Sequence, residues 1–296
     1  MSNFTANSKD NAWTVGAARS WAMAELRRGG VEAPDLTADI LVAHTLGWDR
    51  VRVLSHPEIP LGEDARLRLV SLVHRRIAGE PLQYLTGEQE FYGLAMHVTP
   101  SVLIPRPETE ILVEKALQLA AESALWAGHF IDVGTGSGCI AVAIAHELPR
   151  ARVWAVDCSG SALRVARLNA LRHRTAERVC LVRGDLLECF PLRPGFEFVL
   201  SNPPYVALAE SDNLPPEVRN HEPHEALFAG TSGLDVCRRL IPAAAPLLVP
   251  GGYLLMEIGA GQAEAVISMA RRQGLIEAET LRDLRGIPRC LVLRKN

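Results

Sequence analysis

Residues 13 to about 80 carry apolar side chains at helical spacing. In three stretches they recur every three or four positions and so share one face of a helix. The Gly29–Gly30 pair would end the first helix, and Asp35 is a plausible cap for the second. The apolar positions are Val15, Ala18, Trp21, Ala22 and Leu26; then Leu36, Ile40, Leu41 and Val42; then Leu69, Leu72, Val73 and Ile77. This pattern predicts a small all-α domain, which either stabilises the chain or recognises a partner.

The pattern changes near residue 88. The stretch "EQEFYGLAMHVTPSVLIP" has extended, β-rich character, and Gly93 suits the turn of a hairpin. Pro107 and the acidic residues after it are typical of the first turn of a helix. We therefore divide the chain into a helical domain (1–85), a β-hairpin connector (86–106) and a larger domain (107–296).

From about residue 129, short β-rich runs alternate with helical runs. The β-rich runs are "HFIDVG", "RVWAVD", "RVCLVRGD", "FEFVLSNPP" and "GYLLMEIG". This alternation predicts a Rossmann-like α/β fold, a parallel sheet covered by helices on both faces. No helix-length segment separates "IEAETLRDL" from the closing "IPRCLVLRK", so the last strand is expected to pair antiparallel. Ligands of such sheets bind at the carboxyl ends of the strands.

A glycine loop, "DVGTGSGC", follows the first predicted strand and begins a helix. Gly134, Gly136 and Gly138 let the backbone turn sharply and approach a ligand closely. Their G-x-G-x-G spacing differs from the dinucleotide fingerprint, and the absence of a following Walker lysine disfavours ATP. A glycine loop by itself also fits a plain strand-to-helix turn.

Acidic residues at neighbouring strand ends narrow the ligand class. Asp157 ends "WAVD" about 20 residues after the loop, where a carboxylate accepts ribose hydroxyls. Asp185, in "RGDL", is placed to accept from an adenine amino group, and Asp132 to hold the loop or a ligand ammonium. A lone aspartate at a strand end is often only a helix cap. The full set fits a nucleoside that carries an amino acid, S-adenosyl-L-methionine.

The fourth strand ends in "SNPPY". Pro203 and Pro204 have no N–H and a fixed φ, so their carbonyls face no competing donor. The Asn202 side-chain oxygen and the Pro203 carbonyl can accept both hydrogens of a planar –NH2 group, with Tyr205 stacked behind it. This grip directs the nitrogen lone pair at an electrophile and stabilises the developing positive charge. The plain alternative is a rigid turn after an edge strand.

Composition excludes several function classes. The 296 residues include 48% hydrophobic and 22% charged residues and carry a net charge of −3, unlike the basic surface of a general nucleic-acid binder. The opening residues "MSNFTANSKDNAWTV" lack a signal pattern, and no apolar run reaches the roughly 18 residues of a membrane span. We expect a cytoplasmic protein with no metal and with mostly structural cysteines: Cys139, Cys158, Cys180, Cys189, Cys237 and Cys290.

Taken together, "DVGTGSG", "AVD", "GDL" and "SNPPY" resemble the class I S-adenosylmethionine-dependent N-methyltransferases. Within that class, "GEPLQYLTGEQEFYGL", "LIPRPETE" and "HEPHEAL" resemble the release factor glutamine methyltransferases, the PrmC/HemK family, over nearly the whole chain. The resemblance implies methylation of the glutamine in the Gly-Gly-Gln motif of peptide chain release factors to N5-methylglutamine. The implied partner is a protein, with no direct nucleic-acid requirement and no membrane, and we expect a monomer.

The resemblance also implies roles for individual residues. The catalytic residues would be Asn202, Pro203 and Tyr205, and the same three with Pro204 would bind the substrate. The family often has an aromatic residue at the position of Leu186, where a leucine still covers the adenine face. The implied cofactor-binding residues are Asp132, Gly134, Thr135, Gly136, Ser137, Gly138, Asp157, Asp185, Leu186 and Asn202. Structural ion pairing competes with a role at the site for Arg106, Glu108, Thr109, Arg219 and Glu222.

Four other classes stay open at this point. A sibling family methylates a glutamine of ribosomal protein uL3 with the same site, and only partner recognition separates the two. DNA adenine-N6 methyltransferases share N-P-P-Y, but the low pI and the 5% aromatic content disfavour them. An NAD(P)-linked oxidoreductase would have no use for N-P-P-Y, and a non-catalytic scaffold would show a degraded site.

Overall fold

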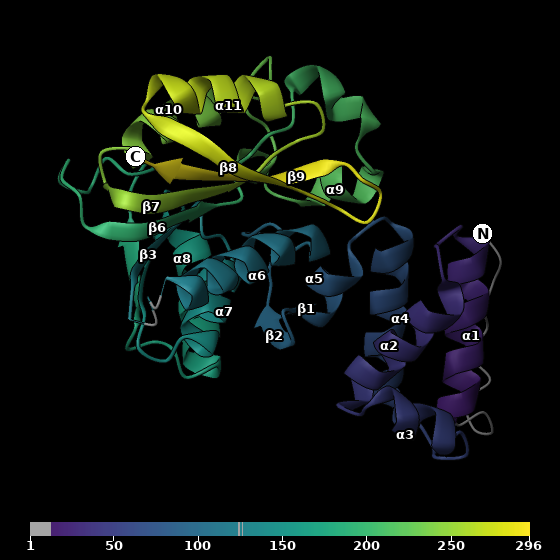
Figure 1. The fold of residues 1–296 in the computed structure, drawn as a ribbon. Helices are drawn as coiled ribbons and strands as arrows, with labels where there is room; N and C mark the ends of the chain where they lie inside the picture. Colours follow the sequence, from purple (N-terminus) through teal and green to yellow (C-terminus); the bar gives the residue numbers. More distant parts are fainter. Residues whose placement is uncertain (1–12, 124, 126) are drawn as a thin grey trace. The chain divides into compact units, whose positions relative to one another are not determined.

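The computed structural model describes residues 13–123, 125 and 127–296. The polar opening stretch, apart from its last three residues, lies outside them. The chain forms two compact units, Met1–Thr86 and Gly87–Asn296, which we describe separately (Figure 1). Among the described residues, no helix combines the length and the apolar character needed to cross a membrane.

The first unit is helical, as predicted. It contains α1 (Val15–Arg28), α2 (Pro34–Leu46), α3 (Arg50–Ser55), α4 (Glu63–Ile77) and α5 (Leu82–Thr86). The predicted faces of α1 and α4 are mostly buried, and Gly29 ends α1. Trp21 and Ile77 are only partly buried and pack against this core.

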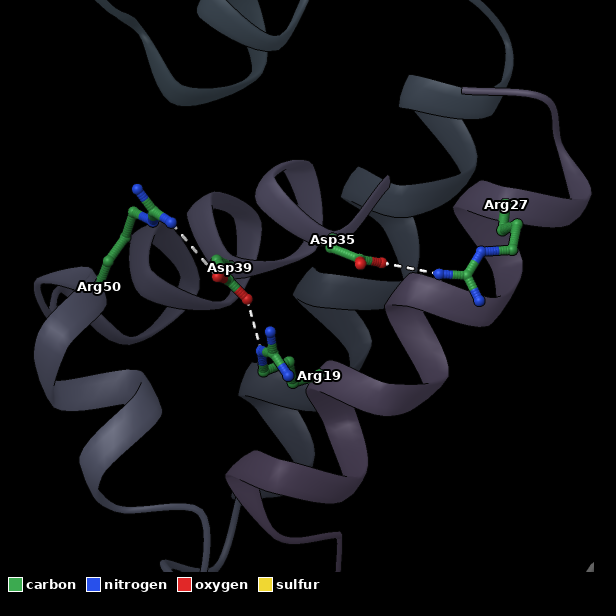
Figure 2. A network of polar contacts seen from close by, with 5 residues as sticks. All are labelled: Arg19, Arg27, Asp35, Asp39 and Arg50. Carbon is green, nitrogen blue, oxygen red and sulfur yellow. Dashed lines mark hydrogen bonds and ion pairs between the residues drawn. The ribbon is translucent and has the colours of Figure 1, made fainter. Parts of the chain in front are cut away.

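Two predictions for α2 are wrong. Leu36 is 43% exposed, although Leu41 and Val42 of the same predicted face are buried, together with Ala38. Asp35 does not cap the helix, which begins at Pro34, a residue whose missing N–H suits a first turn. The Asp35 carboxylate instead accepts a hydrogen bond from Arg27 at 3.0 Å (Figure 2).

A buried carboxylate joins three helices of this unit. Asp39 of α2 is 4% exposed and accepts from Arg19 of α1 at 2.5 Å. Arg50 of α3 lies 3.5 Å from its other oxygen (Figure 2). A buried charge is tolerated when it is paired and hydrogen-bonded, so these arginines are what keep Asp39 in the helical core.

The second unit begins with a hairpin of β1 (Glu88–Phe91) and β2 (Leu94–His97). Its turn residues Tyr92 and Gly93 have φ of 52° and 72°. Two positive φ angles belong to the tight turn that matches strand twist, which confirms the predicted role of Gly93. The helix α6 (Pro107–Glu122) then begins at Pro107, also as predicted.

A seven-stranded sheet forms the centre of this unit. Its strands are β3 (His129–Val133), β4 (Arg152–Asp157), β5 (Val179–Arg183), β6 (Phe196–Ser201), β7 (Leu248–Glu257), β8 (Leu275–Arg282) and β9 (Pro288–Lys295). The order is β5-β4-β3-β6-β7-β9-β8. The strands β3 to β7 pair in parallel, and β9 is antiparallel to β7 and β8. The predicted antiparallel last strand is thus confirmed.

Helices cover both faces of the sheet (Figure 1). On one face, α6, α7 (Cys139–Glu147) and α8 (Gly160–Arg172) contribute to a core with Phe130, Phe198 and Leu255. On the other, α10 (Asp235–Ala244) and α11 (Ala263–Arg272) pack against Ile131, Val199 and Leu254. The segment between β6 and α10 contains η1 (Leu208–Asn213), α9 (Pro216–His221) and η2 (His224–Ala226).

The six cysteines are free thiols, and three of them, Cys139, Cys237 and Cys290, are buried. The expectation of structural cysteines fits these three, whereas Cys180 is half-buried and Cys158 and Cys189 are exposed. Within the described ranges, no group of three or more His, Cys, Asp or Glu side chains is arranged to hold a metal ion.

The two aspartates of α2 provide a matched test of buried against exposed ion pairing. We expect Asp39→Asn to lower the free energy of unfolding by about 1–3 kcal/mol, because a buried charged hydrogen bond is lost. Asp35→Asn should change it by less than about 0.5 kcal/mol, because both partners of that pair are more than half exposed. Chemical denaturation of the purified full chain measures both. Equal effects would contradict the role of Asp39.

Candidate active site

A cavity of about 460 Å³ lies at the carboxyl ends of β3 to β6. Parallel strands deliver the residues that follow them to one edge of a sheet, so loops far apart in sequence meet there. The segment before α6 completes the wall with Pro100, Ser101, Val102 and Leu103. Of the predicted cofactor-binding residues, the following line this cavity: Gly134, Gly136, Asp157, Asp185, Leu186 and Asn202.

The glycine loop leaves open space on its cavity side. Gly134, Gly136 and Gly138 have φ of 72°, 54° and 81°, a region that favours glycine. A Cβ on Gly134 would meet nothing within 4 Å, whereas one on Gly138 would lie 3.0 Å from the Ala166 Cβ. Gly134 and Gly136 therefore leave room for a ligand, and Gly138 allows α7 to pack closely on α8.

Backbone donors hold the Asp157 carboxylate in place. Its Oδ2 accepts from the Gly136 N–H at 2.8 Å and its Oδ1 from the Ser159 N–H at 2.9 Å. A carboxylate offers about four acceptor positions, so two remain for further donors. Asp157 faces the cavity with a fixed orientation, which suits a pair of ribose hydroxyls.

Asp132 lies beneath the loop and outside the cavity lining. It is fully buried, and its Oδ2 accepts from the Thr135 hydroxyl at 2.5 Å and the Ala141 N–H at 3.2 Å. Its Oδ1 has no hydrogen-bond partner. Burial raises the pKa of Asp132 from 3.8 to about 7. Of its two predicted roles, the structure shows contacts only for holding the loop. Thr135 and Ser137 are buried parts of the same loop.

The loop after β5 supplies Asp185 and Leu186 to the cavity. Asp185 is exposed, and its Oδ2 accepts from Arg239 at 2.6 Å. Leu186 has a φ of 49°, which is unusual for a leucine. Residues in such strained backbone conformations cluster at functional sites. Sequence reasoning missed Arg239, because nothing local signals that α10 faces this loop.

Three of the four residues of N-P-P-Y line one of two cavities. Asn202 and Pro204 line the first, while Pro203 is buried and lines neither. Tyr205 lines a neighbouring cavity of about 430 Å³ with Gly259 and Gln262, beyond the carboxyl ends of β6 and β7. The Gln262 side chain donates to the Tyr205 carbonyl at 2.9 Å, which fixes the backbone at the end of the motif.

A short chain of hydrogen bonds runs behind the motif. The Asn202 Nδ2 donates to the Thr109 hydroxyl at 3.0 Å, and that hydroxyl donates to the Glu257 Oε2 at 2.6 Å. The Tyr205 hydroxyl donates to the Glu257 Oε1 at 3.2 Å. Glu257 was missed from the sequence. The only signal for it was an acidic residue that closes the apolar run "GYLLM".

Three of the other residues whose roles stayed open make ion pairs. Arg106 lies 2.5 Å from Glu222, whose carboxylate is almost fully buried. Arg219 pairs with Asp212 at 2.9 Å. Neither pair lines either of the two cavities described above, and Glu108 is exposed at the start of α6. The pair between Arg106 and Glu222 attaches the segment after N-P-P-Y to the start of α6.

A parallel sheet with one reversed strand, a glycine loop after β3 and a carboxylate at the end of β4 define a class I methyltransferase fold. Solved structures agree at the level of fold. The hMettl16 catalytic domain, in complex with a MAT2A 3'UTR hairpin, matches with a TM-score of 0.55 and 16% identity, over 78% of this chain and 81% of that one. A methyltransferase from Pyrococcus furiosus matches with a TM-score of 0.50 and 16% identity, over 79% and 100%.

Sequence comparisons define the family. Residues 17–87 match the family model "PrmC N-terminal domain", and residues 108–215 match "Methyltransferase small domain". The release factor glutamine methyltransferase of Geobacter sulfurreducens is 44% identical over 95% of this chain and 96% of its own length. That of Moorella thermoacetica is 44% identical, over 94% and 98%. The chain belongs to the release factor glutamine methyltransferase family.

The methyl donor of this family is S-adenosyl-L-methionine, and the residues of the cavity fit it. The open space above Gly134 and Gly136 admits a ligand, and Asp157 offers two unused acceptor positions beside it. The enzyme is accordingly an S-adenosyl-L-methionine-dependent protein methyltransferase.

Removing the Asp157 carboxylate tests its expected contact with ribose. We expect Asp157→Ala to weaken binding of S-adenosylmethionine by roughly 1–3 kcal/mol, because the hydroxyls lose their acceptors. Asp212→Ala, at an exposed ion pair away from the cavity, is the control. Isothermal titration calorimetry measures both, and unchanged affinity in Asp157→Ala would show that another group holds the ribose.

The buried Asp132 predicts a pH dependence of stability. Because its pKa is raised to about 7, the stability it contributes is full below about pH 3.8 and is lost as pH rises through about 7. Asparagine does not titrate. The melting temperature of Asp132→Asn should therefore rise relative to that of the wild type as pH rises from about 5 to 8. Thermal denaturation without cofactor measures this. A constant offset between the two proteins would contradict the expected titration.

Proposed function

We propose that this protein transfers the methyl group of S-adenosylmethionine to the side-chain amide nitrogen of the glutamine in the Gly-Gly-Gln motif of release factors. The relatives named above are release factor glutamine methyltransferases by name, and they align along nearly the full chain. The orientation of the Asn202 side chain is the observation that carries the proposal. Asn202 lines the first cavity, and a hydrogen bond fixes which way its side-chain amide points. No other sequence-predicted residue has both properties.

Hydrogen-bond logic supports an acceptor role for the Asn202 oxygen. A carboxylate only accepts, so the single proton of the Thr109 hydroxyl points to Glu257. Thr109 must then accept from Asn202, which directs the Asn202 –NH2 group away from the cavity. The Asn202 Oδ1 has no hydrogen bond to the protein among the described contacts, so it is free to accept from a substrate.

The chemistry that follows needs acceptors rather than a strong base. An amide nitrogen is a weak nucleophile because its lone pair is delocalised. When its two hydrogens are held by the Asn202 oxygen and the Pro203 carbonyl, pyramidalisation is favoured and the lone pair points at the methyl group. The N–C bond forms as the C–S bond breaks, and the electron pair stays on sulfur as S-adenosylhomocysteine. The nitrogen then loses its proton to solvent.

We assign recognition of the release factor to the helical domain, residues 1–85 in our division of the chain. A glutamine on a large protein must reach a recessed site, and a separate domain can bind the bulk of that protein. We further propose a monomeric enzyme that acts in the cytoplasm, where release factors function. A uL3-directed methyltransferase would use N-P-P-Y in the same way, so only the protein partner distinguishes it. A DNA adenine methyltransferase would need a more basic surface than a net charge of −3 provides.

Methyl transfer from labelled S-adenosylmethionine tests the proposal. The acceptors are a purified release factor, the same factor with its Gly-Gly-Gln glutamine changed to alanine, uL3 and unmethylated DNA. We expect label on the first acceptor alone. Label on uL3 or DNA instead would preserve the amine chemistry and overturn the partner assignment.

The same assay tests the acceptor mechanism. We expect Asn202→Ala to lower the transfer rate by about 100- to 1,000-fold, the usual effect of removing one group that stabilises developing charge. The affinity for S-adenosylmethionine should fall far less, because the contacts of the glycine loop and Asp157 remain. Retained transfer in this variant would refute the mechanism.

A further inference from the structure

A buried carboxylate without a cationic partner stands behind the N-P-P-Y motif. Glu257 is the last residue of β7 and is 2% exposed. Within the described part of the chain, no Lys or Arg forms an ion pair with it; both of its oxygens accept from hydroxyls instead. Burying a carboxylate carries a desolvation cost that an apolar side chain of similar volume would not have. A carboxylate here therefore calls for a reason beyond packing.

Each oxygen of Glu257 holds a different residue of the motif. Oε1 accepts from the Tyr205 hydroxyl at 3.2 Å, and Oε2 holds Asn202 through the Thr109 hydroxyl, with links of 2.6 and 3.0 Å. Thr109 belongs to the first turn of α6 and is 2% exposed. A single acidic group thus joins β7, α6 and both ends of N-P-P-Y in one network.

The direction of this network depends on the acceptor at its end. If Glu257 carried a proton, it could donate to Thr109, and Thr109 could donate to the Asn202 oxygen. The Asn202 amide would then turn its –NH2 group toward the substrate –NH2 group, where two donors meet and no hydrogen bond forms. Only the ionised carboxylate requires the orientation that presents oxygen to the substrate.

We propose that Glu257, acting through Thr109, is the positioning residue that holds the Asn202 oxygen toward the substrate amine. The proposal rests on the function proposed above. It assigns Glu257 no contact with substrate or cofactor. Its second contact holds the Tyr205 ring by the hydroxyl, so that both ends of the motif keep a fixed spacing.

Several charged and titratable groups face Glu257 and bear on its ionisation. Burial is the largest influence and raises the pKa of Glu257, and Glu108 acts in the same direction. The hydroxyls of Thr109 and Tyr205, and the charge of Arg289, lower the pKa. The neighbouring titratable groups are Tyr205 after β6, Glu108 on α6, Cys139 on α7, and Arg289 and Cys290 on β9.

The first test removes the middle of the network. Thr109→Val keeps the side-chain shape and deletes the hydroxyl, so we expect kcat to fall by about 10- to 100-fold, the range for a misplaced catalytic group. The KM for the acceptor and the affinity for S-adenosylmethionine should change by less than about threefold. Thr109→Ser restores the hydroxyl and should recover most of the lost rate. A kcat within about twofold of wild type in Thr109→Val would overturn the proposal.

A matched variant controls for loss of stability. Thr175 is 1% exposed and its hydroxyl donates to the Ala170 carbonyl at 3.3 Å, away from the cavities. Thr175→Val therefore deletes another buried threonine hydroxyl and should lower the melting temperature without lowering kcat. An equal loss of kcat in both valine variants would show that destabilisation alone explains the effect.

The second test follows the pH dependence of kcat at saturating cofactor, which reports the enzyme–substrate complex. The wild type should lose activity as pH falls through the raised pKa of Glu257, because the protonated carboxyl reverses the network. Glu257→Gln cannot titrate, so its profile should lack this acid limb. An unchanged acid limb in Glu257→Gln would count against the proposal.

A third measurement separates this inference from the choice of substrate. If a release factor takes up no label, the same variants are compared on whichever acceptor does, because any planar –NH2 group needs the same Asn202 orientation. If no acceptor is labelled, the measurement is instead the ¹⁵N NMR signal of the Asn202 side-chain amide. This signal is assigned by its loss in Asn202→Ala. That signal should shift in Thr109→Val and should not shift in Thr175→Val. Equal shifts would refute the network.

Discussion

Parallel pairing of β3 with β4 on one side and β6 on the other is the constraint on which the site depends. The strand order reverses direction at β3, so the loops after β3 and β6 diverge and leave a crevice between them. The carboxyl ends of five parallel strands then meet at one edge. Gly134, Asp157 and Asn202 are separated by tens of residues, yet they line one cavity because of this pairing.

Two buried carboxylates occupy this edge, and their environments differ. Asp132 keeps an oxygen without a partner under the glycine loop, and burial raises its pKa to about 7. Glu257 has a hydroxyl donor on each oxygen, and neither donor is charged. Both acids are held at a cost in desolvation. In each case the carboxylate contacts a polar residue that shapes the site, Thr135 for Asp132 and Thr109 for Glu257.

The helical unit has a different organisation. Its core is apolar, with one buried carboxylate, Asp39, shared between arginines of two other helices. Residues 17–87, which include nearly all of its described part, match the "PrmC N-terminal domain" model.

The sequence alone determined the alternation of strands and helices, the glycine loop, the strand-end aspartates and the N-P-P-Y motif. Each of these is encoded locally, by periodicity or by residues whose backbone preferences are strong, such as the glycine at 93 and the proline at 107. Local rules failed where a neighbouring element decided the outcome. Leu36 is exposed although Leu41 and Val42 of its predicted face are buried, and Asp35 lost its expected capping role because the helix already begins at Pro34.

Only the tertiary structure decided which polar groups act together. Glu257, Thr109 and Asn202 lie on three separate elements, and no sequence spacing relates them. The same holds for Arg239 and Asp185. The physical reason is that a hydrogen bond depends on a distance of about 3 Å between atoms, and sheet pairing and helix packing set that distance. The sequence therefore predicted several of the residues that line the cavity, and the fold revealed the polar groups that contact them.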